Sequence, residues 1–223
     1  MMRQEKIVEL KQKLIQDATL VEDMITKSVR GLVDRDPELL NQVMNTEEPK
    51  VNDYDRAIDE LCVELIAKFE PVARDLRMVI MIIKMNKDLE RMADHAVNIS
   101  ESGIYLIANP VLGSYDDLRL MGNAAVSMLK DGINAFVNED VKLAQAVCER
   151  DNIVDNAGDK ILKDLTELMR VKKDAIPRGL ALMRIAHNLE RVADLATNIA
   201  EEVVYIVEGR DIKHHHTDDH SHG

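Results

Sequence analysis

Apolar residues recur at spacings of three and four along almost the whole chain, and the strict alternation typical of strands is absent. Combined with start and stop signals, this periodicity predicts six long helices, over residues 3–34, 37–69, 72–107, 115–137, 140–170 and 175–208. Asp36 followed by Pro37 is typical of an N-cap with proline at the first helical position. Pro49 predicts a break or kink in the second helix, and the stretch 108–117, with Pro, Gly and Ser, predicts a linker.

The sequence contains an internal repeat. VDRDPEL (33–39) matches VNEDVKL (137–143), VNDYDRAID (51–59) matches VCERDNIVD (147–155), and LERMADHAVNIS (89–100) matches LERVADLATNIA (189–200). Nine of the fifteen positions from 88 to 102 are identical 100 residues later. We therefore expect an all-α protein, a tandem pair of antiparallel three-helix bundles over residues 1–109 and 110–209. The remaining residues, 210–223, read as a disordered His- and Asp-rich tail.

Charge and composition narrow the classes of function. The net charge is −12, which argues against nucleic acid and anionic membrane surfaces as direct ligands. The N-terminal stretch is charged throughout, and the longest apolar run, 78–83, is too short to cross a bilayer. These features favour a cytoplasmic protein without membrane insertion. The two cysteines, Cys62 and Cys148, lack metal-ligand spacing and are expected to be helical, partly buried thiols.

Each repeat places acidic residues in a stripe beside the core face of a helix. On a helical wheel the stripes of the third helices contain Glu90, Asp94, Asn98 and Glu101, and Glu190, Asp194, Asn198 and Glu201. The second helices carry the pairs Asp55/Asp59 and Asp151/Asp155. Like charges four residues apart destabilise a helix by roughly 0.2–0.5 kcal/mol per pair, so their recurrence suggests a cation between them. Carboxylate and amide oxygens suit Mg²⁺, Ca²⁺, Mn²⁺ or iron, and Zn²⁺ at the borderline; the sequence does not identify the ion.

A solvated surface is the alternative to a metal site. Lys87 can pair with Glu90, Arg91 with Asp94, and Arg191 with Asp194, all three residues apart. His95 and His187 are expected to face solvent or form salt bridges. The tail contains clustered histidines, His214, His215, His216, His220 and His222. Two interpretations remain for them, loose metal binding and an inert segment.

The repeat, the acid-x-x-x-Asp pairs in both halves and the phrase PVARDLR (71–77) together resemble the PhoU family of phosphate-transport regulators. The resemblance covers about residues 3–208 and implies the tandem bundle fold. It also implies a negative regulator of phosphate uptake and phosphate-starvation signalling. Members act with the ATPase of the phosphate ABC transporter and with a sensor histidine kinase, and some carry iron or zinc clusters. One departure is that DAIPRGLALMR in the second half does not repeat the element Asp75-Leu76-Arg77.

Three hypotheses follow from the sequence. The first is a metal-bearing regulatory adaptor, and the second is a metal-free helical adaptor whose acidic stripes bind basic partner surfaces. The third, a metal-dependent phosphatase, ranks last because no dedicated base, nucleophile elbow or phosphate-binding glycine loop is visible. We therefore expect no enzymatic activity. The abundant methionines and exposed stripes permit a homodimer but do not require one.

Overall fold

The structure is a computed structural model that describes residues 2–208. Its helices confirm the all-α prediction. The predicted tail, 210–223, and Gly209 lie outside the described residues. The chain runs through α1 (Met2–Val33), α2 (Pro37–Gln42), a π-helical segment η1 (Val43–Glu47), α3 (Glu48–Phe69), α4 (Arg74–Ile107), α5 (Asp116–Asn138), α6 (Val141–Glu149), α7 (Asp151–Val171), a 3₁₀ turn η2 (Lys173–Ala175) and α8 (Ile176–Glu208).

Local sequence signals explain some of the helix ends. The Asp36 carboxylate caps α2 by accepting hydrogen bonds from the backbone N–H groups of Glu38 at 2.9 Å and Leu39 at 3.3 Å. The predicted linker separates α4 from α5. The helix predicted over 72–107 is α4, and it begins at Arg74 because Ala73, with a φ of 47°, lies outside the helical region.

Of two predictions about helix continuity, one is confirmed and one was wrong. The predicted break near Pro49 is present, and Pro49 itself lies in the first turn of α3, where its missing N–H is not needed. The irregularity lies just before it, in the π-helical segment η1, where an extra residue per turn is inserted. The predicted helix 140–170 was wrong, because it is divided at Arg150 into α6 and α7. The Arg150 guanidinium donates hydrogen bonds to Asp131 on α5 at 2.7 Å and to the Ser127 hydroxyl at 3.2 Å.

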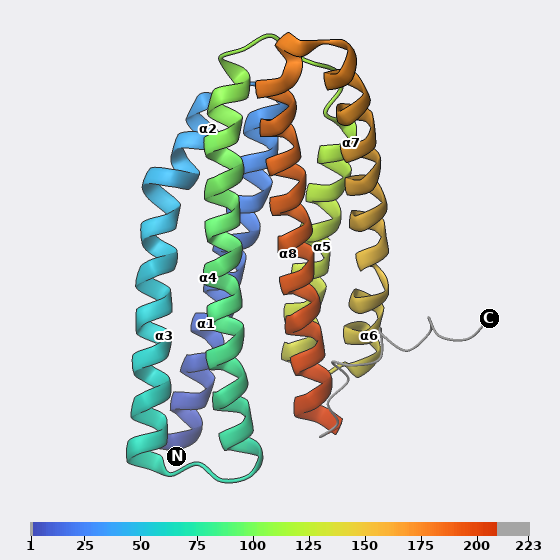
Figure 1. The fold of residues 1–223 in the computed structure, drawn as a ribbon. Helices are drawn as coiled ribbons and strands as arrows, with labels where there is room; N and C mark the ends of the chain where they lie inside the picture. The colour runs from blue at the N-terminus through green and yellow to red at the C-terminus, as the bar shows by residue number, and fades with distance from the viewer. Residues whose placement is uncertain (1, 209–223) are drawn as a thin grey trace, which may run out of the picture.

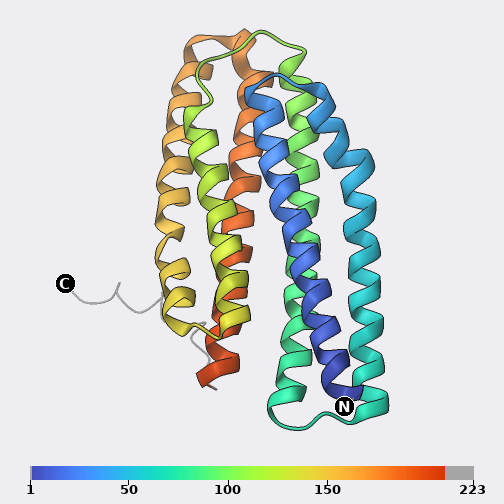
Figure 2. The same cartoon turned by 180° about the vertical axis from the view of Figure 1, so that it is seen from behind.

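The helices form two bundles that stand side by side. One bundle holds α1, α3 and α4, and the other holds α5, α7 and α8, with α2 and α6 extending α3 and α7. Figure 1 shows α3, α4, α8 and α7 in this order across the front, and Figure 2 shows α1 and α5 on the opposite side. Helices α4 and α8 run antiparallel and share the most extensive contact in the described part of the chain. The LER motifs of both repeats therefore lie at the centre of the molecule.

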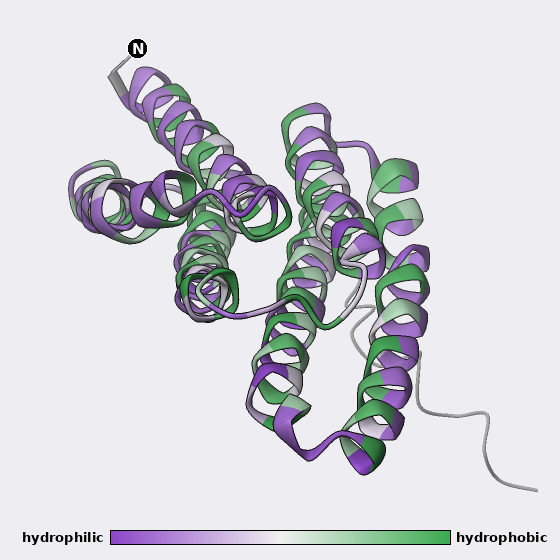
Figure 3. Ribbon diagram, turned by 90° about the horizontal axis from the view of Figure 1, so that it is seen from above, coloured by the Kyte–Doolittle hydropathy of each residue, from purple (hydrophilic) through white to green (hydrophobic). Residues whose placement is uncertain are grey.

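Buried apolar side chains from both bundles join in one continuous cluster. Seen from above, the hydrophobic stretches of the helices turn largely toward neighbouring helices (Figure 3). The two halves share the same pattern of burial: every buried position from 14 to 32 on α1 has a buried counterpart 104 residues later on α5. The predicted boundary between residues 109 and 110 falls in the segment joining α4 to α5, whereas the core continues across the two bundles.

Candidate functional site

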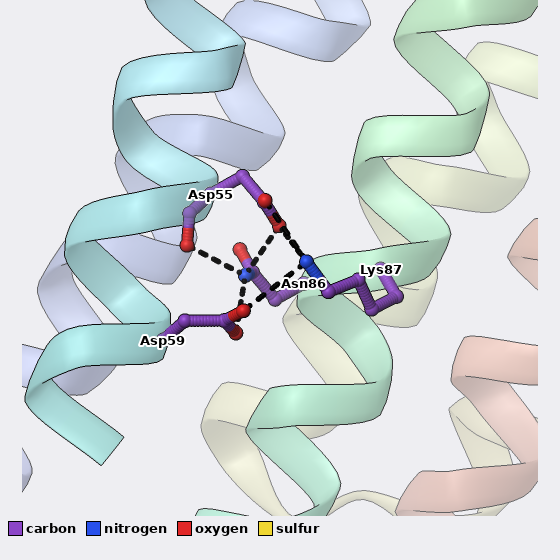
Figure 4. A network of polar contacts seen from close by, with 4 residues as sticks. All are labelled: Asp55, Asp59, Asn86 and Lys87. Atoms are coloured by element: carbon purple, nitrogen blue, oxygen red, sulfur yellow. Dashed lines mark hydrogen bonds and ion pairs between the residues drawn. The ribbon is translucent and has the colours of Figure 1, made fainter. Parts of the chain in front are cut away.

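The acidic pair of the first bundle meets a lysine. Asp55 and Asp59 lie one turn apart on α3 and face α4 (Figure 4). The Lys87 ammonium contacts Asp55 Oδ1 at 2.8 Å, Asp55 Oδ2 at 2.9 Å and Asp59 Oδ2 at 3.1 Å. The hydrogen bond to Asp55 raises the pKa of Lys87, with burial opposing it, so the ammonium stays charged at neutral pH. A cation does sit between the two acids, and it belongs to the protein.

Asn86 holds the same two carboxylates from deeper in the bundle. Its side chain is fully buried, and Nδ2 donates to Asp55 Oδ1 at 2.8 Å, to the Asp55 carbonyl at 3.1 Å and to Asp59 Oδ1 at 3.2 Å (Figure 4). The pairing of Lys87 with Glu90 that the sequence suggested was wrong. Two carboxylates on the neighbouring helix attract the ammonium more than one carboxylate on its own helix.

The acidic surface of α4 continues from Glu90 to Asp94. Burial raises the pKa of both carboxyl groups, and nearby negative charges add to the effect. For Glu90 these charges are Asp94 and Asp55; for Asp94 the charge is Glu48, in the first turn of α3. The sequence alone does not indicate Glu48 as part of this acidic surface, because its place there depends on how α3 and α4 are aligned. Arg91 does not pair with Asp94 and lies 3.8 Å from Asp88.

Asn98 and Glu101 take part in a different contact. Arg184 of α8 reaches across the junction between the bundles and bonds Asn98 Oδ1 at 2.8 Å and Glu101 Oε2 at 3.3 Å. Lys84 makes the related contact to Glu202 at 3.2 Å near the other end of the junction. Asn98 and Glu101 were expected to belong to one continuous acidic stripe, but their charge partner lies on the other bundle.

The second bundle brings Asp155 near the acids of α8, and among the described residues no lysine forms an ion pair with it. Burial raises the pKa of Asp155, and the charges of Asp194 and Asp159 raise it further. Burial likewise raises the pKa of Glu190; His187 opposes this, and Asp155 and Asp159 add to it. Asp159 was missed, although it lies four residues after Asp155. The Glu190 carboxylate packs over Gly158, where a Cβ atom would lie 1.9 Å from Oε1.

The remaining predicted residues lie at the edges of the second site. Asp151 is the first residue of α7. Burial is the main cause that raises the pKa of the Cys148 thiol to about 11, and the negative charges of Glu201 and Asp151 add to it. Asn198 is half-buried on α8. His187 lies 3.6 Å from Glu190, as a salt-bridging histidine would, and Arg191 pairs with Asp194 at 3.3 Å as expected. His95 instead bonds the Asn188 side chain of the other bundle at 2.8 Å.

The carboxylate and amide oxygens of these residues suit a hard cation. Between residues 2 and 208, no three His, Cys, Asp or Glu side chains converge so that they could hold one ion. In the first bundle the residues do not fit a metal, because Lys87 takes the position between Asp55 and Asp59. In the second bundle the acids influence one another without converging. Metal binding therefore stays a prediction.

The described helices include none that is both long and apolar enough to span a membrane. The family model "PhoU domain" matches the chain twice, over residues 14–103 and 118–203, one match in each bundle. The chain is 33% identical over 210 residues to the phosphate-specific transport system accessory protein PhoU homolog of Pseudomonas putida, covering 94% of this chain and 82% of that protein. Identity to the Aquifex aeolicus homolog is also 33%, with 95% of each chain covered.

Solved structures agree with the family match. The crystal structure of PhoU from Pseudomonas aeruginosa superposes with a TM-score of 0.89 at 33% identity, covering 93% of this chain and 99% of that one. The phosphate transport system regulatory protein PhoU from Streptococcus pneumoniae gives a TM-score of 0.85 at 31% identity, with 94% and 99% covered. The chain therefore belongs to the PhoU family, as its sequence motifs indicated.

Proposed function

We propose that the protein is a cytoplasmic accessory regulator of phosphate transport that represses uptake and starvation signalling when phosphate is plentiful. In this role it is an adaptor between the ATPase of a phosphate ABC transporter and a sensor histidine kinase. Support comes from the match of both bundles to the family and from relatives whose names place them with the phosphate-specific transport system. The observation that carries the proposal is the acidic surface of the second bundle, formed by Asp155, Asp159, Glu190 and Asp194.

This surface suits a basic partner. Besides burial, the charges of Asp159 and Asp194 raise the pKa of Asp155, and those of Asp155 and Asp159 raise the pKa of Glu190. A positive side chain or metal ion that approaches these carboxylates relieves the repulsion. Direct contact with basic residues of a partner needs no further group. A metal ion bound there, iron, zinc, manganese, magnesium or calcium, is the second form of the proposal. It would bridge the acids to an anionic partner.

An enzymatic role is not proposed. Burial is the main cause that raises the pKa of Cys62 to about 12 and of Cys148 to about 11, so both thiols stay protonated and are poor nucleophiles at neutral pH.

The test is complementation of a bacterial strain that lacks its own PhoU-family protein, with a phosphate-starvation reporter measured in phosphate-rich medium. Wild-type protein is expected to restore repression, and Glu190→Gln/Asp194→Asn to restore it several-fold less well. The matched control, Glu167→Gln/Asp174→Asn, removes two exposed carboxylates outside the stripe and is expected to behave as wild type. Failure of the wild-type protein to repress would contradict the proposal.

Elemental analysis separates the two forms of the proposal. Protein purified without a metal column is compared with the Glu190→Gln/Asp194→Asn variant. Stoichiometric metal that is lost in the variant supports the metal-bearing form. No metal in either protein supports direct contact with a basic partner surface.

A further inference from the structure

The two bundles carry the same acidic motif but treat it differently. In the first bundle one ammonium contacts three carboxylate oxygens, at 2.8, 2.9 and 3.1 Å. An ammonium has three N–H donors, so the pair of aspartates uses the full capacity of Lys87 (Figure 4). The Asp55 side chain is 17% exposed, whereas those of Lys87 and Asp59 are 44% and 39% exposed. The contact to Asp55 therefore lies partly out of water, where charge interactions are stronger.

Further acceptor atoms lie behind this ion pair. Asn86 is fully buried, and its Oδ1 accepts no hydrogen bond from the described residues, although Nδ2 of the same amide binds both aspartates. Asp17 on α1 is also fully buried with both carboxylate oxygens unpartnered, and its charge interacts with that of Asp55. Without Lys87, this region would present carboxylate and amide oxygens from three helices and no cation.

The second bundle lacks the equivalent lysine. Positions 100 residues after Asn86 and Lys87 hold Ala186 and His187. His187 is 62% exposed and approaches Glu190 on its own helix. In the described part of the chain, no lysine or arginine forms an ion pair with Asp155 or Asp159.

We propose that Lys87 is a built-in counter-ion that closes the acidic site of the first bundle to metal ions and to basic side chains of partners. A cation from solution must displace an ammonium that is tethered beside the site and therefore present at a high effective concentration. The acidic motif of the first bundle is then a structural ion pair between α3 and α4. This inference goes beyond the proposed function and does not depend on it, because it concerns cation binding by the isolated protein.

The experiment is a calorimetric titration of the full chain with Mn²⁺, an ion that prefers oxygen ligands. All proteins carry Glu190→Gln/Asp194→Asn, so that the second acidic surface is silenced. Adding Lys87→Met is expected to create one Mn²⁺ site per chain that binds at least tenfold tighter than any site in the parent. Adding Asp55→Asn/Asp59→Asn to this variant is expected to abolish the new site.

Lys68→Met is the matched control, because it removes one positive charge and an ion pair with Glu64 from α3 of the same bundle. Its Mn²⁺ binding is expected to equal that of the parent. The proposal is overturned if Lys87→Met binds Mn²⁺ no better than Lys68→Met. It is also overturned if the parent binds Mn²⁺ through Asp55 and Asp59 with Lys87 in place.

A second measurement uses the unaltered chain and does not depend on the folding of a variant. An ammonium held by three oxygens exchanges its protons slowly and gives a distinct ¹H–¹⁵N signal for the Lys87 side chain. This signal is expected to persist unchanged when millimolar Mg²⁺ is added. Its loss on addition of Mg²⁺, or its absence at the start, would show that the site is open.

Discussion

Asp17 of α1 and Met121 of α5 occupy equivalent positions in the two bundles, and both are fully buried. The neighbouring pairs Leu14/Leu118 and Val21/Ala125 confirm the equivalence, since each pair is buried and 104 residues apart. The same place in the core therefore holds a carboxyl group in one bundle and an apolar thioether in the other. Burial, with a smaller contribution from the charge of Asp55, raises the pKa of Asp17 from 3.8 to about 7.

This difference predicts that Asp17→Met stabilises the protein in a pH-dependent way. Between about pH 4 and 7 the folded state keeps the Asp17 proton that the unfolded state releases, so wild-type stability falls as pH rises through this window and levels off above it. The stability of Asp17→Met does not fall in this pH window, because methionine has no proton to release. Its advantage is expected to be on the order of a few kcal/mol at pH 8 and much smaller at pH 4.5. Urea unfolding at both pH values measures it.

The reciprocal change, Met121→Asp, is the control. It places a carboxyl group in the equivalent site of the second bundle and is expected to destabilise the protein, more at pH 8 than at pH 4.5. An advantage of Asp17→Met that is equal at the two pH values would contradict a role for Asp17 ionisation.

Two glycines of α5 are predicted to respond to alanine in opposite ways. A Cβ on Gly122 would lie 2.8 Å from Val29 Cγ2 on α1, and the β-branched valine has little freedom to move. Gly122→Ala is therefore expected to destabilise by about 1–3 kcal/mol. A Cβ on Gly132 meets atoms no closer than 3.5 Å, so Gly132→Ala is expected to stabilise by roughly 0.5–1 kcal/mol. Thermal unfolding measures the stability of both variants, and a stabilising Gly122→Ala would contradict the close packing of α1 against α5.

Lys27 is predicted to be essential for stability next to the π-helical segment. Its ammonium pairs with Glu47, which is only 5% exposed, and with Asp23 at 2.6 Å. Lys27→Met leaves the Glu47 carboxylate buried without this ammonium. The free energy of unfolding, measured with urea, is expected to fall by about 3 kcal/mol.

Two further variants test the cause of this loss. Lys27→Met/Glu47→Met is expected to recover most of it, because no buried charge remains. Lys6→Met removes an exposed pair with Glu9 and is expected to change stability by less than about 0.5 kcal/mol. A double variant as unstable as Lys27→Met would show that the loss does not arise from the buried carboxylate.

The two basic residues at the bundle junction are predicted to differ in importance. Lys84 contacts Glu202, whose side chain is 4% exposed, so Lys84→Met removes a charge partner from a buried carboxylate and is expected to lose about 1–3 kcal/mol. The pair between Arg184 and Glu101 is about half exposed on both sides, so Arg184→Met is expected to lose less than about 1 kcal/mol. Guanidinium-induced unfolding compares them; a larger loss for Arg184→Met would contradict this ranking.

The sequence predicted the helices, the duplication and the family because these depend on local signals and on repeated spacing. Apolar periodicity locates a helix whatever lies beside it, and Asp36 and Pro37 mark a start without tertiary contacts. What it missed are relationships between helices. Glu48, Asp159 and the role of Lys87 depend on which turn of one helix faces which turn of the next.

The second bundle shows why this alignment was hidden. Sequence identity aligns the pair Asp55/Asp59 with Asp151/Asp155, 96 residues later. In the structure, the two acids of α7 that raise the pKa of Glu190 on α8 are instead Asp155 and Asp159. Sliding one helix by four residues, about one turn, returns nearly the same face, so the apolar pattern fits more than one alignment. The buried position of Asp17 was missed for a similar reason, since one acid within an apolar stripe leaves the period intact.

The continuous core across the two bundles has an evolutionary consequence. Had the two halves been separate copies of one chain in a symmetric dimer, every substitution would appear on both sides of the interface. Because one polypeptide carries both halves, each half can change alone while the apolar contacts between α4 and α8 keep them together. Two such differences lie at equivalent positions of the repeats: Lys87 in the first half corresponds to His187 in the second, and Asp17 corresponds to Met121. A gene encoding a single bundle could not have accumulated them.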